Sequence, residues 1–194
     1  MDSEIIIQEK PDWVSWDDIH ELLWEAHAQN RKKGVIMRYP SLPGKEIKKR
    51  IEGKGVMLVA MKGKQLIGTS ALIVKKMSLW CGKGDYAYFC FDSVSPEFQG
   101  KGVYKQLNQK REGIAKNLGI NRLVLDTNES NEREINVVKK AGFKNVAMKR
   151  YDEHFNVVFV KWLEKCPYSN IRCKFEFIKQ KIKVKTKTLL HRSF

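Results

Sequence analysis

The sequence lacks the features of several protein classes. It has no apolar run near the ~18 residues that a membrane-spanning helix needs. Its N-terminus, MDSEIIIQEK, carries acidic residues and a single short apolar run, unlike a secretory signal peptide. We therefore expect a cytoplasmic protein without an integral membrane segment.

Cysteine and histidine are too sparse for a metal centre. None of the four cysteines forms a C-x-x-C pair, and the four histidines are scattered along the chain. Structural zinc sites need such ligands at close spacing, so we predict no metal. Reduced thiols are the expectation in the cytoplasm, with a bridge between Cys166 and Cys173 as the open alternative.

Negative charge is also scarce. The chain has 37 Lys and Arg against 22 Asp and Glu, a formal net charge of +15. This balance favours anionic partners such as phosphates, nucleotides, nucleic acid or an acidic membrane surface. Residues 166–194 hold eight Lys/Arg and one Glu, and the stretch KIKVKTKTLL favours a lysine-rich edge strand or an extended arm. We treat 164–194 as a basic C-terminal extension of one domain, residues 1–163.

Apolar periodicity and turn residues predict a mixed α/β domain. Ser15 and Asp18 are expected to form a capping box at the start of the first helix. The unit of strand 86–94, helix 101–118 and strand 122–127 predicts a parallel strand pair. The other predicted strands are 5–8, 56–61, 65–77, 145–150 and 156–162, and the other predicted helices are 15–33, 44–53 and 131–142.

Residues 99–102, QGKG, stand where a strand leads into the long helix. The first N–H groups of a helix lack partners and its dipole is positive there, so phosphate binds well. Glycine lets the backbone approach a phosphate closely, and Lys101 adds a cation. The motif thus favours phosphate binding, with a plain tight turn as the alternative.

The segment VSPEFQGKGV, residues 94–103, resembles motif A of the GNAT superfamily, the acyl-CoA-dependent N-acyltransferases, in its bacterial form. Gln99 and Gly102 match that motif, whereas Tyr104 stands where the family has Gly or Ala. The segment NEREINVVKKAGFKNV resembles motif B, with Asn131 opening its helix. The order of elements is similar to that of the family over roughly 1–163.

The resemblance implies a GNAT-like fold with a mixed, mostly antiparallel, splayed sheet flanked by helices. Strands 86–94 and 122–127 would diverge to admit acetyl-CoA, the implied cosubstrate. The implied binding residues lie on the first of these strands, in the glycine turn and at the motif B helix. They are Val94, Gln99, Gly100, Lys101, Gly102, Val103, Tyr104 and Asn131.

Direct acyl transfer needs a base for the amine and an acid for the leaving thiolate. Strand alternation predicts that Asp92 shares a face with Tyr88, Cys90 and Val94, which makes Asp92 the candidate base. A carboxylate that only caps the following turn is the alternative for Asp92.

The usual acid of the family is a tyrosine late in the motif B helix, where this sequence has Val138. Tyr104 is the candidate substitute, with Tyr88, Tyr151 or unassisted departure of the thiolate as alternatives. Cys90 as a nucleophile is less favoured than Cys90 as a buried structural thiol.

These features predict an acetyl-CoA-dependent N-acetyltransferase that acts on a primary amine of a small molecule. Like charges repel, so an amino sugar or another phosphate-bearing amine fits this cationic chain better than a polyamine. Candidate acceptor contacts are Arg38, Tyr39, Trp80 and Tyr86. We expect no specific nucleic-acid partner, and a homodimer stays open.

Two other functions stay open from the sequence. The first is a GNAT-fold acyl-CoA-binding protein with impaired catalysis, which Val138 and Tyr104 favour. The second is a binder of nucleic acid or membrane surfaces that uses the basic extension.

Overall fold

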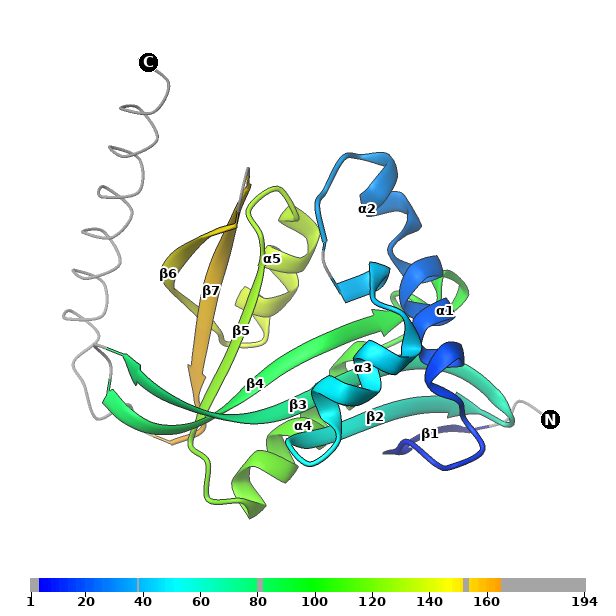
Figure 1. The fold of residues 1–194 in the computed structure, drawn as a ribbon, viewed down its shortest axis with the longest axis horizontal. Coiled ribbons are helices and arrows are strands. Elements are labelled where there is room, and N and C mark those ends of the chain that lie inside the picture. Colours follow the sequence, from blue (N-terminus) through cyan, green and yellow to red (C-terminus); the bar gives the residue numbers. More distant parts are fainter. Residues whose placement is uncertain (1–3, 38, 80–81, 152–153, 165–194) are drawn as a thin grey trace.

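A seven-stranded sheet forms the centre of the protein (Figure 1). The computed structural model describes residues 4–37, 39–79, 82–151 and 154–164. The strand order is β1-β2-β3-β4-β5-β7-β6, and every neighbouring pair is antiparallel except β4 and β5. The strands are β1 Ile5–Glu9, β2 Gly55–Lys62, β3 Gln65–Leu79, β4 Gly82–Val94, β5 Arg122–Asn128, β6 Lys144–Tyr151 and β7 His154–Trp162.

Helices cover both faces of this sheet and bury separate parts of the core. The apolar side chains of α1 and α3 pack on one face, whereas those of α4 and α5 pack on the other. Ser15 and Asp18 form the predicted capping box at the start of α1. The helices are α1 Trp16–Ala26, α2 Ala28–Lys32, α3 Gly44–Ile51, α4 Val103–Asn117 and α5 Glu132–Lys140, with 3-10 turns η1 Tyr39–Ser41 and η2 Pro96–Phe98.

The two parallel strands separate toward their carboxyl ends. Among the described residues, β4 and β5 pair at Ala87 with Leu123 and at Tyr88 with Val124. Beyond these pairs β5 continues to Asn128 alongside β7, and β4 continues to Val94 alongside β3. Figure 1 shows the two strands pointing apart past this crossing. The splayed, mostly antiparallel sheet predicted from the sequence is therefore confirmed.

A β-bulge at Phe91 changes the alternation of β4. Phe91 has a φ of 57°, and the register of β3 with β4 shifts between Thr69 and Ala71. A left-handed conformation costs a bulky residue roughly 1–2 kcal/mol. The Thr69 hydroxyl stabilises it by donating to the Phe91 carbonyl oxygen over 2.9 Å.

The bulge makes one prediction wrong. Tyr86, Tyr88 and Cys90 face the α1 and α3 side as alternation predicts, but Phe91 faces the same side. Asp92 therefore turns to the opposite face, where it meets α4. An extra residue in a strand shifts the side-chain parity after it, and no turn residue in the sequence marks this shift.

The predicted helix 15–33 is interrupted at His27. Its backbone there has φ −100° and ψ 10°, and α1 ends at Ala26 before α2 begins at Ala28. The interruption accompanies a contact between the His27 ring and the end of β4. The long helix begins at Val103 rather than at 101, because Gly102 is left-handed with φ 81°.

Several predictions fall outside the described part of the chain. The basic extension lies outside it from residue 165 onward. The same holds for the side chains of Arg38, Trp80, Cys81, Tyr151, Cys166 and Cys173. No helix among the described residues has the length and apolar character to cross a membrane.

Gly55 gives a test of the β2–β3 packing. A Cβ added at Gly55 would lie 2.0 Å from the Leu72 carbonyl oxygen, a severe overlap with backbone. We expect Gly55→Ala to lower the free energy of unfolding by ~2 kcal/mol or more, as overpacking does. The matched control is Gly113→Ala in α4, where no atom lies within 4 Å of the added Cβ. That change should raise stability by ~0.5–1 kcal/mol through helix propensity. Urea unfolding of both variants decides it, and equal stabilities would contradict the packing.

Candidate functional site

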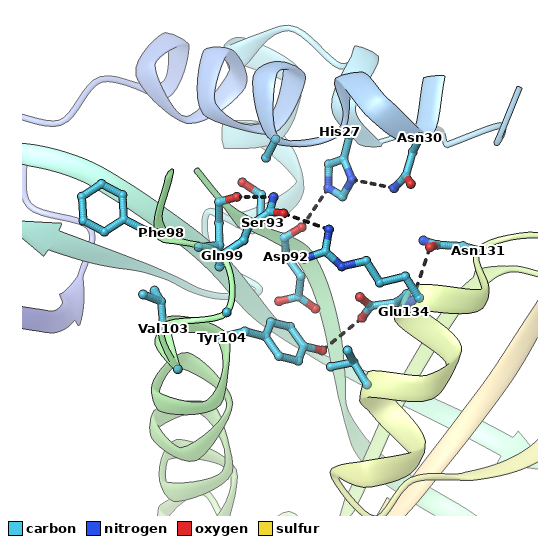
Figure 2. Close-up of a pocket in the computed structure, with 16 residues that line it drawn as sticks. His27, Asn30, Asp92, Ser93, Phe98, Gln99, Val103, Tyr104, Asn131 and Glu134 are labelled. Atoms are coloured by element: carbon cyan, nitrogen blue, oxygen red, sulfur yellow. Dashed lines mark hydrogen bonds between the residues drawn. The ribbon is translucent and has the colours of Figure 1, made fainter. Parts of the chain in front are cut away.

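A cavity of about 370 Å³ lies where β4 ends, between α4 and α5 and below the end of α1 (Figure 2). It brings together Asp92 and all but one of the predicted binding residues. Those lining it are Val94, Gln99, Gly100, Gly102, Val103, Tyr104 and Asn131. Lys101 is not among the lining residues, and its ammonium lies 5.0 Å from the centre of the Phe98 ring.

The glycine turn forms an uncovered cradle at the start of α4. Gly100 and Gly102 have φ angles of 79° and 81°, a conformation that favours glycine. No atom lies within 4 Å of a Cβ built on either residue, so the space beside this backbone is open. Gly102 is also the N-cap of a 15-residue helix, whose first N–H groups and dipole attract an anion. The turn therefore has the shape and charge of a phosphate site.

Gln99 and Arg133 connect the glycine turn to α5. The Gln99 side chain donates to the Val94 carbonyl oxygen over 3.0 Å and accepts from the Arg133 guanidinium over 2.8 Å. Arg133, which lines the cavity, thus brings a cation beside the glycine turn. Sequence reasoning missed Arg133, although it follows Asn131 by two residues in motif B.

Asp92 lies beside a fully buried cation. Arg111 of α4 has no exposed side-chain surface, and its guanidinium lies 2.7 Å from Asp92 Oδ1. The pair is close but poorly directed, because Oδ1 has no hydrogen bond of good geometry. Burial raises the pKa of Asp92 to about 6, and the positive charge of Arg111 opposes that rise. Asp92 is thus ionised at neutral pH, with a pKa close to that range.

Tyr104 and Glu134 face each other across the cavity. Figure 2 shows the Tyr104 hydroxyl of α4 pointing toward the Glu134 carboxylate of α5, to which it donates over 3.1 Å. Burial, and then the negative charge of Asp92, raises the pKa of Glu134 to about 7. Burial, followed by the charges of Asp92 and Glu134, also raises the pKa of Tyr104 well above 10. Tyr104 therefore keeps its proton at neutral pH.

Sequence reasoning missed Glu134, although a signal existed. Asn131 caps α5 by accepting from the Glu134 backbone N–H over 3.4 Å, so the two residues lie one helical turn apart. Residues three apart on a helix share a face, which puts Glu134 beside any group that Asn131 contacts.

His27 joins the interruption between α1 and α2 to the end of β4. Its Nε2 lies 3.0 Å from the Asp92 carbonyl oxygen, and its Nδ1 lies 3.3 Å from the Asn30 amide nitrogen. Burial lowers the pKa of His27, so the ring is neutral. A neutral ring meets both contacts when Nε2–H donates to the carbonyl and Nδ1 accepts from Asn30. His27 therefore orients the end of β4 with both nitrogens engaged.

Two residues weighed in the sequence have buried positions. Val138 is fully buried in the core under α5, which matches an apolar residue without a catalytic role. Cys90 is free and buried, and burial raises the pKa of its thiol. A protonated thiol is a poor nucleophile, which disfavours covalent catalysis by Cys90.

A smaller cavity of about 70 Å³ continues from the first on the α1 side of the sheet. Both cavities are lined by His27, Asp92, Asn131 and Glu134. Asp126 also lines the smaller cavity and accepts hydrogen bonds of 2.5 Å from the Tyr88 hydroxyl and the Asn156 amide. The Tyr39 hydroxyl lies 3.2 Å from that of Tyr88. This network fixes one wall of the smaller cavity.

Residues 16–143 match the model of the Acetyltransferase (GNAT) family. The match spans well over half of the chain and includes the glycine turn and α5. The chain belongs to the GNAT acetyltransferase family. The fold and the predicted enzyme class agree with this membership.

Solved structures of GNAT acetyltransferases have the same fold. A GNAT-family acetyltransferase from Staphylococcus aureus Mu50 aligns with a TM-score of 0.64 and 16% identity, over 83% of this chain and 100% of that one. One from Elizabethkingia anophelis with acetyl-CoA bound gives 0.62 and 19%, over 82% and 98%. The ribosomal-protein-S18-alanine N-acetyltransferase from Escherichia coli gives 0.61 and 13%, over 86% and 100%. No curated protein sequence matches the chain.

The raised pKa of Glu134 predicts a pH-dependent stability. Its pKa is about 7 in the folded state against an ordinary 4.5, so its protonated form stabilises the fold below pH 4.5. That contribution is lost as the pH rises through 7. We expect the wild type to lose up to ~3 kcal/mol relative to Glu134→Gln between pH 4.5 and 8. Urea unfolding across this range measures the difference, and Glu132→Gln on the exposed side of α5 is the control. A difference that does not change with pH would contradict the burial of Glu134.

Proposed function

We propose that this GNAT acetyltransferase transfers the acetyl group of acetyl-CoA to a primary amine of a small molecule. The observation that carries the proposal is the uncovered glycine cradle, which opens into the 370 Å³ cavity beside two diverging parallel strands. Family membership and the acetyl-CoA bound in a structural neighbour support the same cosubstrate.

The cradle residues fit the phosphate end of acetyl-CoA. Backbone amides at Gly100, Gly102 and Val103 and the start of α4 would hold the pyrophosphate, with Arg133 as a nearby cation. Asn131 and Tyr104 line the passage from this turn toward Asp92. Acetyl-CoA, when bound, supplies an activated acyl carbonyl to this passage.

Asp92 has the properties of the general base. A base is most effective when its pKa lies near the working pH, and burial brings that of Asp92 to about 6. Its carboxylate would accept the proton of the attacking amine, directly or through one water. The nearby Arg111 limits the rise in the pKa of Asp92, because a positive neighbour favours the ionised carboxylate.

Tyr104 is the candidate proton donor for the leaving sulfur. It keeps its hydroxyl proton at neutral pH, and its hydroxyl lies at the cavity wall. Its pKa is higher than that of an ordinary thiol, ~8.5, so we assign it a hydrogen bond to the developing thiolate rather than full proton transfer. Glu134 accepts from this hydroxyl before the reaction, so the single O–H would turn from Glu134 to the sulfur as the thiolate forms.

The strongly positive chain favours an acceptor that carries negative charge. A net charge of +15 repels polyamines and attracts phosphate-bearing amines such as amino sugar phosphates. The test is release of free thiol from acetyl-CoA across a panel of neutral, cationic and phosphate-bearing amines. Release above the background hydrolysis with any of these amines supports the proposal, and no release with all of them contradicts it.

Gly102→Glu tests the cradle. The change puts a side chain and a negative charge where the pyrophosphate would lie, so acetyl-CoA affinity should fall at least ~30-fold. Gly119→Glu is the matched control, because Gly119 is also left-handed at φ 69° with no atom within 4 Å, beyond the other end of α4. Calorimetry on both folded variants decides it. Unchanged affinity in Gly102→Glu would refute the assignment of the cradle.

Asp92→Asn tests the base. The change keeps the shape of the side chain and an oxygen for Arg111 but removes the proton acceptor. We expect kcat to fall by ~10²-fold with acetyl-CoA affinity little changed. Asp85→Asn, on an exposed part of the same strand, is the control. If kcat stays within threefold while the melting temperature falls, Asp92 is a structural partner of Arg111 and another group is the base.

A further inference from the structure

A third cavity, of about 250 Å³, lies on the α1 and α3 side of the sheet between the end of α3 and β3. Its cations come from three separate segments. Arg50 lies in the last turn of α3, Lys54 in the turn that follows, and Lys75 on β3. None of the described residues that line this cavity is acidic. The fold thus gathers positive charge here without a carboxylate in the lining.

Two of these cations are only partly compensated. Arg50 Nε is buried and has no hydrogen-bond partner among the described residues. The Lys75 ammonium lies 3.8 Å from the centre of the Tyr88 ring, a favourable but weak contact. A buried donor without an acceptor costs free energy, so an anion that accepts from Arg50 would stabilise this arrangement.

Lys75 also feels the other cations. Burial lowers the pKa of Lys75, and the positive charges of Lys149 and Arg50 lower it further. The acidic groups that oppose this lowering are Cys90 and Asp126. The buried Cys90 thiol keeps its proton, and the two oxygens of Asp126 already accept from Tyr88 and Asn156. The local field is therefore suited to an added negative charge.

The three cavities follow one another along the protein. The Tyr39 and Phe91 rings, with centroids 4.6 Å apart, line both the cationic cavity and the 70 Å³ cavity. The 70 Å³ cavity in turn shares Asp92 with the 370 Å³ cavity. An elongated acceptor lying over the Tyr39–Phe91 pair would therefore have one end near Asp92 and the other near Arg50.

We propose that the cavity formed by Arg50, Lys54 and Lys75 binds the anionic group, a phosphate or carboxylate, of the amine that this enzyme acetylates. The inference rests on the proposed N-acetyltransferase function and adds to it the substrate class and the residues that select it. Tyr39 and Phe91 separate the anion from the amine and so set the distance between the two groups in an accepted substrate.

The first test measures anion binding without turnover. Inorganic phosphate and succinate are titrated by NMR into the wild type, with and without saturating CoA, and into Arg50→Gln/Lys75→Gln. The control is Lys45→Gln/Lys76→Gln, which removes the same charge from exposed positions on the same two elements. We expect the affinity for at least one anion to fall at least ~10-fold in the first variant and less than threefold in the control.

Each outcome of this titration decides the anion site. Weaker anion binding in Arg50→Gln/Lys75→Gln alone supports the anion site. The anion that binds, phosphate or succinate, then identifies the recognised group as a phosphate or a carboxylate. No binding to the wild type, or equal affinities in both variants, overturns it. If the double variant does not fold, Arg50→Gln and Lys75→Gln are titrated singly.

The second test links the site to the acceptor. Acetyl transfer is compared for glucosamine 6-phosphate and glucosamine, two amines that differ by one phosphate. We expect Arg50→Gln/Lys75→Gln to raise KM at least ~10-fold for the phosphorylated amine, while KM for glucosamine and acetyl-CoA stays within threefold. Equal changes for both amines overturn the acceptor role. Absence of transfer to any amine, with anion binding still lost in the variant, refutes the transferase proposal instead of the anion site.

Discussion

The buried guanidinium of Arg111 is the interaction on which the site most depends. It donates to the Ala71 carbonyl oxygen of β3 over 3.1 Å, donates to Asn108 of its own helix, and lies 4.0 Å from the centre of the Phe89 ring. These contacts hold α4 against β3 and β4, and so fix where the glycine turn meets the end of β4. A buried charge without a partner costs several kcal/mol, so Asp92 is held beside Arg111 by the same need that anchors the helix.

The bulge at Phe91 determines which face of the sheet Asp92 occupies, and so allows it to meet Arg111. Without the extra residue, Asp92 would continue the alternation of Tyr88 and Cys90 and point to the α1 side, away from Arg111. With it, Asp92 and Val94 turn toward α4, while the Phe91 ring stays with Tyr39 on the acceptor side. The strain of a left-handed phenylalanine is offset by the Thr69 hydrogen bond and by the ion pair that the turn of Asp92 permits. One irregular residue thus places the Asp92 carboxylate and the Phe91 ring on opposite faces of the sheet.

The sequence predicted the regular parts of this structure and missed those that depend on tertiary contacts. Element order, the parallel pair β4–β5 and the glycine turn follow from periodicity and turn residues, which are local signals. The bulge at Phe91 and the interruption at His27 were not predicted, because a group distant in sequence contacts each of them, the Thr69 hydroxyl in one case and the Asp92 backbone carbonyl in the other. Arg111 did leave a signal: it stands at i+4 from Leu107 on the apolar stripe of α4, where a charged residue requires a buried partner.

The positive charge differs in kind between the two ends of the proposed site, the glycine turn for acetyl-CoA and the cavity for the acceptor. At the glycine turn, backbone amides and the α4 dipole attract phosphate without placing a full charge beside the reacting atoms. At the acceptor end, Arg50 and Lys75 are full charges, and a positive neighbour lowers the pKa of an amine. On the proposed arrangement the anionic group of the acceptor offsets these cations, so the groups nearest its amine are the carboxyl groups of Asp92 and Glu134. A carboxylate beside an amine favours its charged form, so the neutral amine that attacks a thioester forms when a carboxylate accepts its proton. Asp92 and Glu134, with pKa values raised by burial, then take up the released proton near neutral pH. The cations therefore act on which substrate binds, whereas the buried carboxylates act on the proton of its amine.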